Sequence, residues 1–459
     1  MAEAGVIADT PTVIQPGVSA SWKLRPGAGL TFIFIWLFLV AIYARPEDIV
    51  PALGQLHLTF VLGACAALTF LWSLFLGHVT LAWSRELGLV LLLTLWYTAG
   101  IPFAYWRSGS FAVLTQVWLK TVLIFFVMTQ TLCTLERIRW ALWAIILSDL
   151  FVTAYSLMGS SQVRWVEGRM FGINQGILGW NFLGIAAALI IPYIAALFIA
   201  NRSLLRSCLL AAATLSMLWM LMLTASRSGT FDVAFSVLAT SLLVIRGSSR
   251  GRLIGTGIIL ALVISICLAP SVFWERMGTI SGGEWTGSGG SVAASAEMSE
   301  QDRLAVLKRS VDYTLNHPVF GLGLGNLQAA NGNELRQPDA WVGSHNTFTE
   351  ISSEGGVPAL VFFLTLLGTA LRRTKRVGRV AFEGSAGAEL SLMARATQAS
   401  LLSFIFAGCF AHLGYEYFLY TGPVAIAVGI QRVAARQAEV VAPVELDPAW
   451  TQTLPGCAS

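Results

Sequence analysis

The run ILGWNFLGIAAALIIPYIAALFI, residues 177–199, contains no charged side chain. A helix of about 20 mostly apolar residues crosses the hydrocarbon core of a bilayer, which is about 30 Å thick. A stretch of this length and composition therefore predicts a membrane-spanning helix and not an element of a soluble domain.

Comparable runs recur along the whole chain. They lie at residues 29–44, 56–76, 86–104, 110–132, 138–158, 177–199, 205–225, 229–245, 253–271, 356–371, 397–413 and 416–433. Of the 459 residues, 56% are hydrophobic and 12% are charged, and that charged share is about half of what a soluble domain carries. We therefore expect an all-α fold, a polytopic transmembrane bundle of about 12 helices.

Basic residues gather in alternate connections between these spans. If the N-terminus is cytoplasmic, the short outer connections carry only Arg45, Arg107, Arg164, Arg169 and Arg227. The inner connections carry many more, including the run Arg372, Arg373, Lys375, Arg376 and Arg379. Because cytoplasmic loops of membrane proteins are enriched in Lys and Arg, we expect both termini to be cytoplasmic.

The spans and their orientation divide the chain into five segments. We expect a disordered cytoplasmic tail at 1–28, spans one to nine at 29–271, a large extracytoplasmic loop at 272–355, spans ten to twelve at 356–436, and a cytoplasmic tail at 437–459. Long loops inside compact proteins are commonly functional. The outer loop is therefore where we expect the chemistry.

The outer loop has two parts of different composition. Residues 282–299 are rich in Gly, Ser and Ala, which predicts a flexible segment. A helix is expected to follow, with Ser299 as its N-cap and apolar residues at helical spacing from Leu304 to Leu315. It should stop before Pro318, because the residue ahead of a proline avoids the helical region.

The stretch SHNTFTE, residues 344–350, is the first candidate for chemistry. If Asn346 caps a helix that enters the membrane, Glu350 and Glu354 follow along one face of that helix. His345 then lies at the mouth of the helix, where an imidazole can accept a proton from a hydroxyl group. The alternative is an interfacial histidine beside an acidic face that is only structural.

Arginines near the outer ends of the spans are the second candidate. Arg227 lies in the tight turn TASRSG, residues 224–229, and its planar guanidinium suits phosphate oxygens. The alternatives are a pair with Asp232 or a side chain that reaches the membrane interface. Arg303 at the start of the loop helix is placed to bind an anion together with Arg169, as are Lys308 and Arg309, although each of these also fits a solvated surface.

Lys120 and Asp149 lie in the middle of the fourth and fifth spans. We expect them to form a buried pair between neighbouring helices, since each charge alone in the membrane is costly. The alternative is a relay for protons or ions.

Several classes of site are disfavoured by the sequence. The six cysteines form no CxxC and have no metal-ligand spacing, and the acidic pairs that hold a divalent metal in nucleotide-sugar enzymes are missing from the loops. The stretch GLGLGN, residues 321–326, lacks the Lys-Ser/Thr of a phosphate-binding loop and reads as a turn. We therefore expect no metal and no cofactor, and the net charge of +4 does not suggest a nucleic-acid partner.

Taken together, these stretches resemble the O-antigen ligase and O-antigen polymerase superfamily of bacterial envelopes. The resemblance is carried, in chain order, by the Arg169 loop with Asn174, the Ser226–Gly229 turn, the segment from Asp302-Arg303 to Asn326, and His345–Glu350 with Glu354-Gly355-Gly356. The corner Arg45-Pro46-Glu47-Asp48 is also similar to polysaccharide polymerases. At Asn174-Gln175 the chain departs from the Asn-Pro-Asn that is common in the family.

The resemblance implies a metal-independent, inverting glycosyltransferase of the bacterial inner membrane with its site on the periplasmic face. The donor would be a glycan on undecaprenyl pyrophosphate, and the acceptor would be the lipid A-core or another glycan. Arg227, Arg303 and Arg169 would bind the pyrophosphate and His345 would activate or position the acceptor hydroxyl. Asn346, Glu350 and Glu354 would support the site, with one of the two glutamates orienting His345.

Two other functions stay open at this point. A repeat-unit polymerase would use the same donor chemistry with another lipid-linked unit as the acceptor. A transporter of lipid-linked saccharides would instead need charged groups along its midplane, where the sequence offers essentially Lys120 and Asp149.

Overall fold

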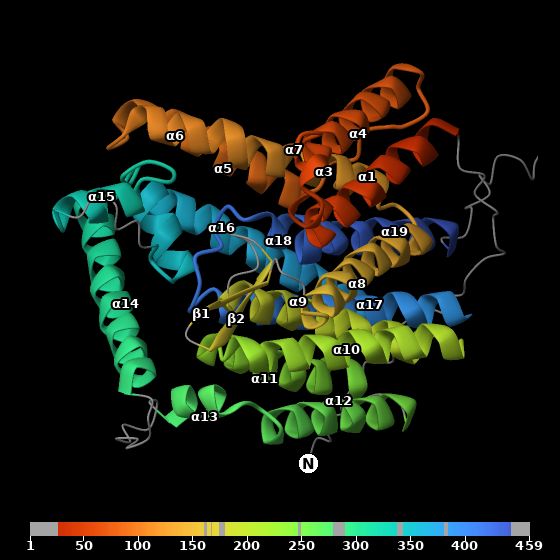
Figure 1. Cartoon of the computed structure of the whole chain (residues 1–459). Coiled ribbons are helices and arrows are strands. Elements are labelled where there is room, and N and C mark those ends of the chain that lie inside the picture. Colours follow the sequence, from red (N-terminus) through yellow and green to blue (C-terminus); the bar gives the residue numbers. More distant parts are fainter. Residues whose placement is uncertain are drawn as a thin grey trace, which may run out of the picture.

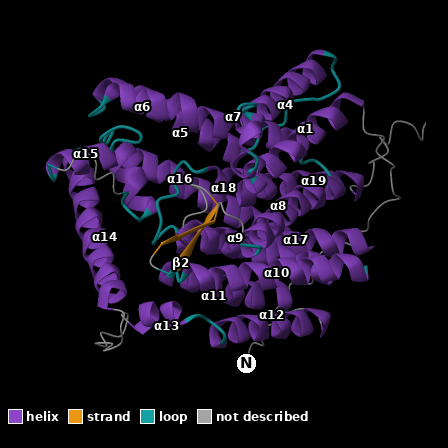
Figure 2. Ribbon diagram, viewed as in Figure 1, coloured by secondary structure: helices purple, strands orange, loops and turns teal. Residues whose placement is uncertain are grey.

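The computed structural model describes residues 26–159, 163–166, 168–173, 180–246, 249–278, 290–336, 343–380 and 384–441. In these parts the chain is helical apart from one two-stranded hairpin and its connections (Figure 2). The predicted tails at 1–28 and 437–459 fall largely outside the described residues.

The first part of the chain forms four spans and the short helices between them. Its elements are α1 Pro26–Ala44, α2 Pro46–Ile49, α3 Pro51–Gly54, α4 Leu58–Phe75, α5 Arg85–Gly100, the 3-10 turn η1 Ile101–Phe103, α6 Arg107–Val113, the π-helical turn η2 Leu114–Trp118 and α7 Leu119–Thr131. Through η2, helices α6 and α7 form one continuous membrane-length helix.

The central part contains five further spans and the hairpin. Its elements are α8 Leu135–Leu157, β1 Val163–Val166, β2 Arg169–Ile173, α9 Trp180–Ala200, α10 Leu204–Thr224, α11 Arg227–Thr240 with the π-helical turn η3 Ser241–Ile245, and α12 Ser249–Cys267. The two strands pair antiparallel, with Val163 opposite Ile173.

The remaining part comprises the outer cap and the last three spans. Its elements are α13 Ser271–Gly278, α14 Gly290–Asn316, α15 Leu327–Glu334, α16 Thr347–Arg379, α17 Gly384–Ala407, α18 Tyr417–Leu419, the π-helical turn η5 Tyr420–Val424 and α19 Ala425–Val441. Helix α14 runs across one end of the bundle, between α13 and α15 (Figure 1). We call this end, which the charge distribution predicts to be extracytoplasmic, the outer end.

The predicted membrane bundle is confirmed. Among the described residues, 11 helices are long and apolar enough to cross a membrane, and Gly29–Ala44 is a shorter apolar helix beside them. All twelve predicted spans correspond to these helices. The predicted start of one span, at 356, coincides with the break that Gly356 makes inside α16. The boundaries of another were wrong, because α17 runs from Gly384 to Ala407, where the apolar run predicted 397–413.

Helix α9 lies at the centre of the bundle, packed against α11 and α17. Pro192 within it has no N–H, so the carbonyl of Ala188 loses its usual partner. The hydroxyl of Ser236 on α11 donates to that carbonyl at 2.5 Å, and Ser400 on α17 donates to the carbonyl of Leu189 at 2.8 Å. In lipid such backbone groups must find partners inside the protein, and these two bonds fasten α9 to its neighbours.

The predicted start of the loop helix was wrong, whereas its end was right. Helix α14 begins at Gly290, not after Ser299, because residues 293–300 are rich in Ala, Glu and Met, which favour helix over flexible chain. It ends at Asn316, two residues before Pro318. The rest of the segment expected to be flexible, 282–289, lies outside the described residues.

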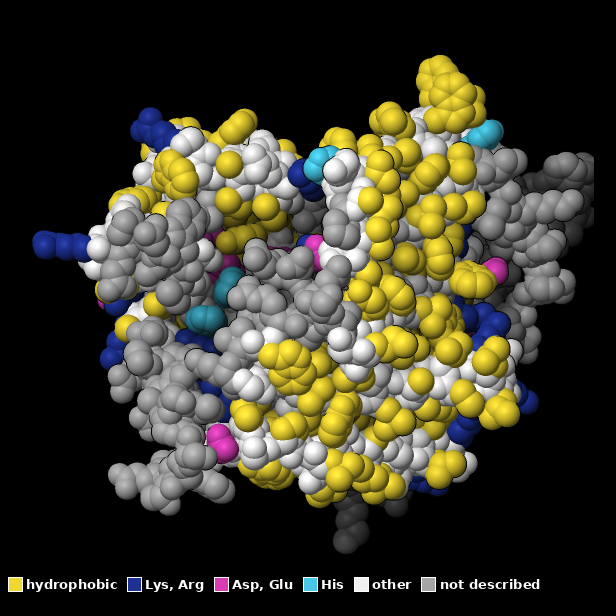
Figure 3. All heavy atoms as spheres, in the orientation of Figure 1, with side chains coloured by type: hydrophobic (Ala, Val, Ile, Leu, Met, Phe, Trp, Pro, Cys, Tyr) yellow, Lys and Arg dark blue, Asp and Glu magenta, His cyan; other side chains and the backbone are white. Residues whose placement is uncertain are grey.

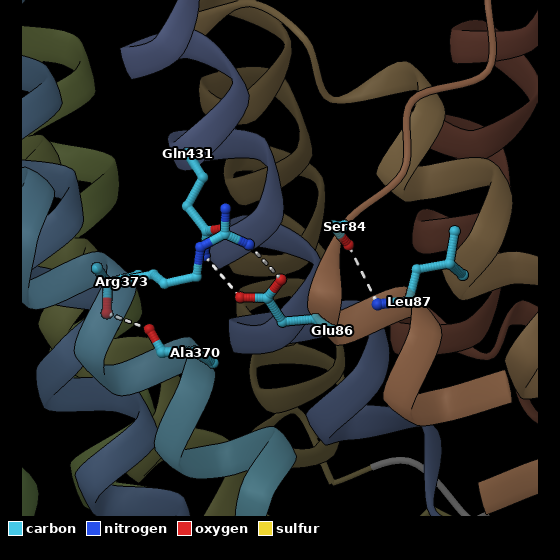
Figure 4. A network of polar contacts seen from close by, with 7 residues as sticks. Ser84, Glu86, Leu87, Ala370, Arg373 and Gln431 are labelled. Atoms are coloured by element: carbon cyan, nitrogen blue, oxygen red, sulfur yellow. Dashed lines mark hydrogen bonds and ion pairs between the residues drawn. The ribbon is translucent and has the colours of Figure 1, made fainter. Parts of the chain in front are cut away.

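A buried carboxylate joins three helices toward the end of the bundle opposite the cap, which we call the inner end. Glu86 on α5 accepts hydrogen bonds from Arg373 Nη1 of α16 at 3.0 Å and from Gln431 Nε2 of α19 at 2.9 Å. Figure 4 shows both side chains reaching Glu86 from their separate helices. Because the Glu86 side chain is fully buried, this network holds the three spans in register.

Candidate active site

Asn346 caps α16 as the sequence predicted, and the cap positions His345. The Asn346 side chain accepts hydrogen bonds from the backbone N–H groups of Phe348 and Thr349, both at 3.0 Å. His345, one residue before the cap, has a φ of 49°, in the left-handed region. That backbone conformation turns the chain sharply at the start of α16 and leaves the imidazole half-buried at the outer end.

The connection between α17 and α18, residues 408–416, is tied to the first turns of α16. Thr347 donates through its backbone N–H to the carbonyl of Gly408 at 2.7 Å and through its hydroxyl to the carbonyl of Ala411 at 2.7 Å. The N–H of Leu413 donates back to the Thr347 hydroxyl at 3.0 Å. We call residues 408–416 the outer loop of α17, and these bonds fix it against α16.

This loop brings a second histidine to the site. The rings of His412 and His345 lie 5.5 Å apart between centroids, with an interplanar angle of 77°. Phe182 at the start of α9 meets the His412 ring edge-on at 6.1 Å. The sequence analysis missed His412 because it placed this residue inside the eleventh span, although an ionisable residue in an apolar run is itself a signal for function.

Arg303 of α14 acts electrostatically on His345. Burial lowers the pKa of His345, and the positive charge of Arg303 and the neighbouring His412 lower it further, to about 3. An imidazole that is neutral at physiological pH is able to accept a proton. Helix α14 is held against α16 by the hydroxyls of Thr314 and Ser352, 2.9 Å apart, so the arginine and the histidine come from two packed elements.

Arg169 and Arg227 are both positioned at the turn between α10 and α11. Arg169 on β2 is buried, and its Nε donates to the carbonyl of Thr224 at 2.9 Å. Arg227 begins α11 directly after Ser226, whose hydroxyl caps the helix by accepting from the N–H of Gly229 at 3.1 Å. The structure therefore brings together two of the arginines that the sequence singled out.

Asp232 does not serve as the partner of Arg227. Within the described part of the chain, both of its carboxylate oxygens are buried without a hydrogen-bond partner, so the alternative of an Arg227–Asp232 pair is wrong. Asp232 instead lies near Cys409 in the outer loop of α17. The pKa of Cys409 is raised mainly by burial and further by the Asp232 carboxylate.

Backbone contacts connect the arginine turn with the histidines. A Cβ on Gly184 of α9 would overlap the backbone of Gly229, so the two helices touch through these glycines. Phe182, two residues before Gly184, contacts His412. The arginine turn and the histidine pair are thus neighbours at the outer end, where Figure 3 shows histidine side chains recessed beside Lys or Arg side chains.

Glu350 and Glu354 have partners other than His345 within the described part of the chain. Glu350 Oε2 accepts from the N–H of Gly414 at 2.9 Å. Glu354 accepts from the N–H groups of Gly325 at 2.7 Å and Leu327 at 3.1 Å. The two carboxylates therefore hold backbone segments around the site, and neither shows the bond that orienting the imidazole of His345 would require.

The GLGLGN stretch is a glycine-rich turn, as predicted. It docks where Gly356, at φ 73°, breaks the helical path of α16. There the N–H groups of Leu322 and Gly323 donate to the carbonyls of Ser353 and Glu354 at 2.7 and 2.9 Å.

The remaining candidate residues from the sequence do not join the histidines and arginines described above. Arg309 donates to the side chain of Asn331 on α15, and Lys308 is exposed. The expected pair of Lys120 with Asp149 is wrong, because Lys120 is on the exposed face of α7 while Asp149 is buried in α8, and the described residues contain no ion pair between them. Helices α7 and α8 present these two side chains to different surroundings.

Comparison with known families gives one match to this part of the chain. Residues 210–364 match the family model described as O-antigen ligase. The match covers about a third of the 459 residues, so this region of the chain is similar to the O-antigen ligase family. The matched region runs from α10 into α16 and includes Arg227, Arg303 and His345, whereas Arg169 and His412 lie outside it.

The matched region and the membrane-length helices together indicate a bacterial membrane protein that is similar to O-antigen ligases in this region. A comparison with curated proteins gives no match.

Proposed function

We propose that this protein is an O-antigen ligase-like inverting glycosyltransferase, which moves a glycan from undecaprenyl pyrophosphate to an acceptor hydroxyl at the periplasmic face of the inner membrane. The observation that carries the proposal is the effect of Arg303 on His345. Two residues from separate elements of the matched region combine a positive charge with a neutral imidazole. A transferase with an anionic leaving group and a hydroxyl nucleophile needs these two functions next to each other.

The donor diphosphate binds on the side of the arginines. Arg227 and Arg303, with Arg169, stabilise the charge that grows on the pyrophosphate as it leaves, through charge-assisted and bidentate hydrogen bonds. Arg227 is also the first residue of α11, where backbone N–H groups favour an anion. Because pyrophosphate is already a competent leaving group, this chemistry needs no metal ion.

The acceptor is activated by His345. Its oxygen forms a bond to the anomeric carbon of the donor, the bond from that carbon to the phosphate oxygen breaks, and the electron pair leaves with the diphosphate. The acceptor proton passes to the imidazole of His345, which is neutral because burial and Arg303 lower its pKa. The bound diphosphate offsets the charge of Arg303, so donor binding makes His345 a stronger base.

Asn346, Glu350 and Glu354 support the site through the backbone. Asn346 caps α16 beside His345, Glu350 holds the outer loop of α17, and Glu354 holds the turn that precedes α15. Their role is to keep the elements that carry His345, His412 and Arg303 in fixed relation to one another.

The proposal is tested by transfer in reconstituted membranes. The purified protein is mixed with undecaprenyl-pyrophosphate-linked glycan and lipid A-core, and transfer of the glycan is followed on a gel. His345→Ala and Arg227→Ala should abolish transfer, whereas Arg372→Ala, which removes an exposed arginine of the opposite end of α16, should not. Full transfer by both site variants, with the protein folded, would remove the assignment.

The nature of the acceptor is tested in a deletion strain. Loss of all glycan capping on the lipid A-core supports a ligase. Single repeat units that remain on the core instead support a repeat-unit polymerase with the same donor chemistry.

A further inference from the structure

The site contains an imidazole to which the proposed reaction has so far given no role. His412 faces His345 from the outer loop of α17, beyond the matched region of the family. Its Nδ1 is buried and has no hydrogen-bond partner among the residues that the structure describes. A buried polar atom without a partner is destabilising, so a hydrogen bond to a ligand would recover the free energy that its burial costs.

The position of His412 is set rigidly. The loop that carries it is bound to α16 by Thr347 and by Glu350, and Asn346 Nδ2 donates to the carbonyl of Cys409 at 3.3 Å. A Cβ on Gly343 would lie 2.9 Å from His412 Nδ1. Gly343, two residues before His345, thus has to be small for the two imidazoles to stay adjacent.

The two histidines differ in their electrostatic surroundings. The charge of Arg303 contributes to the lowered pKa of His345, whereas the pKa of His412 is lowered by burial alone. The charge of Arg303 therefore acts on His345 more than on His412. The outer loop of α17 carries no Lys or Arg, and it carries Glu416, whose pKa is raised by burial.

We propose that His412 forms the acceptor side of the site, where it hydrogen-bonds a hydroxyl of the acceptor sugar while the donor diphosphate binds on the Arg303 side of His345. This inference rests on the proposed function. The surroundings of His412 disfavour an anion, since one acidic side chain, Glu416, and no basic one accompany it on its own loop. They suit a neutral, hydroxyl-bearing ligand, because a neutral imidazole offers one donor and one acceptor nitrogen.

Two measurements on the full-length protein in nanodiscs test the inference. The first is binding of undecaprenyl diphosphate, followed by native mass spectrometry. The second is transfer of glycan from undecaprenyl pyrophosphate to lipid A-core. His412→Ala should bind undecaprenyl diphosphate within twofold of the wild type and transfer at least tenfold more slowly, whereas Arg303→Ala should lose binding at least tenfold.

Matched variants separate a role in acceptor binding from a role in folding. His412→Gln keeps a neutral donor and acceptor and should transfer faster than His412→Ala. Gly343→Ala retains the imidazole but displaces it, and should slow transfer without weakening donor binding. His317→Ala removes an exposed histidine at the end of α14 and should change neither measurement.

The inference is overturned if His412→Ala transfers as fast as the wild type, or if it weakens undecaprenyl diphosphate binding as much as Arg303→Ala does. If His412→Ala does not fold, the same criteria apply to His412→Gln and Gly343→Ala. A wild-type protein that transfers no glycan would instead refute the proposed function itself, so the two failures are distinguishable.

Discussion

The inner and outer ends of the bundle use the same kinds of charged residue in different ways. At the inner end, Arg373 binds the buried Glu86 and Arg139 of α8 binds Glu389 of α17 through two hydrogen bonds of 3.0 and 2.8 Å. At the outer end, the charge of Arg303 acts on a neutral imidazole. Carboxylates are present there as well, but Glu350 and Glu354 are bound to backbone N–H groups.

We propose that the charges at the inner end fasten helices and that those at the outer end are placed for a ligand. An arginine bound to a carboxylate stabilises the fold and has little attraction left for a substrate anion. An arginine close to a histidine lowers the pKa of that histidine, because the two positive charges repel each other. The predictions below test whether the two ends differ in this way.

The largest effect is expected for His345→Ala. Loss of a general base costs about 10²- to 10⁴-fold in rate, so glycan transfer should fall by that amount. The thermal unfolding temperature should stay close to that of the wild type, because the histidine has no hydrogen bond within the described residues that its loss would break. A variant that unfolds early and transfers normally per folded molecule would place His345 with the structural residues of the inner end.

The next largest effect is expected for Arg303→Gln. A hydrogen bond to a charged group contributes about 1.5–3 kcal/mol, so transfer should fall by about 10- to 150-fold. Removing the positive charge also makes the imidazolium less unfavourable, and the pKa of His345 should rise from about 3 toward its ordinary value. The acid limb of kcat/KM, which reports the free enzyme, should then move to higher pH.

The wild type provides the control for this pH profile. Donor binding offsets the charge of Arg303, so the acid limb of kcat should lie at higher pH than that of kcat/KM. In Arg303→Gln the two limbs should come closer together. Identical limbs in the wild type and in the variant would show that Arg303 does not act on His345.

A moderate effect, on stability alone, is expected for Arg373→Met. Breaking a buried ion pair costs about 3–5 kcal/mol, and since the Arg373 side chain is 38% exposed we expect about 2–3 kcal/mol. The variant should unfold at lower temperature by differential scanning fluorimetry and should transfer glycan at the wild-type rate per folded molecule. A selective loss of transfer would contradict the separation of the two ends.

The smallest effect is expected for Arg139→Gln. The Arg139 side chain is 36% exposed in its pair with Glu389, and pairs near the surface contribute about 0–1 kcal/mol. Unfolding should therefore shift less than in Arg373→Met under the same conditions. An equal or larger shift would show that burial of the carboxylate does not decide the strength of these pairs.

Most of the fold could be predicted from the sequence because apolar runs of membrane length are a strong local signal. The errors in the helix boundaries occur where the apolar run and the helix do not end at the same residue. The run that predicted a span at 397–413 continues past Ala407 into the connection that carries His412, while the start of α17 at Gly384 is polar. Hydropathy measures apolar composition and does not register where a helix ends.

A role in the site was predictable from the sequence where the side-chain chemistry of a residue by itself determines a local structure. Asn346 caps its helix as its side-chain chemistry predicts. The partners of Glu350 and Glu354 were not predictable, because backbone N–H groups of Gly325, Leu327 and Gly414 reach them only through tertiary packing. The expected Lys120–Asp149 pair failed for the same reason, since depth in the membrane does not determine which way a side chain faces.

The most direct test of the central claim is an electron cryo-microscopy map of the full-length protein in nanodiscs with undecaprenyl diphosphate. We predict density for the diphosphate at the outer end, within about 3 Å of the guanidinium groups of Arg227 and Arg303, with His345 facing it. Diphosphate density at the inner end, or at an outer position that neither arginine reaches, would contradict the account.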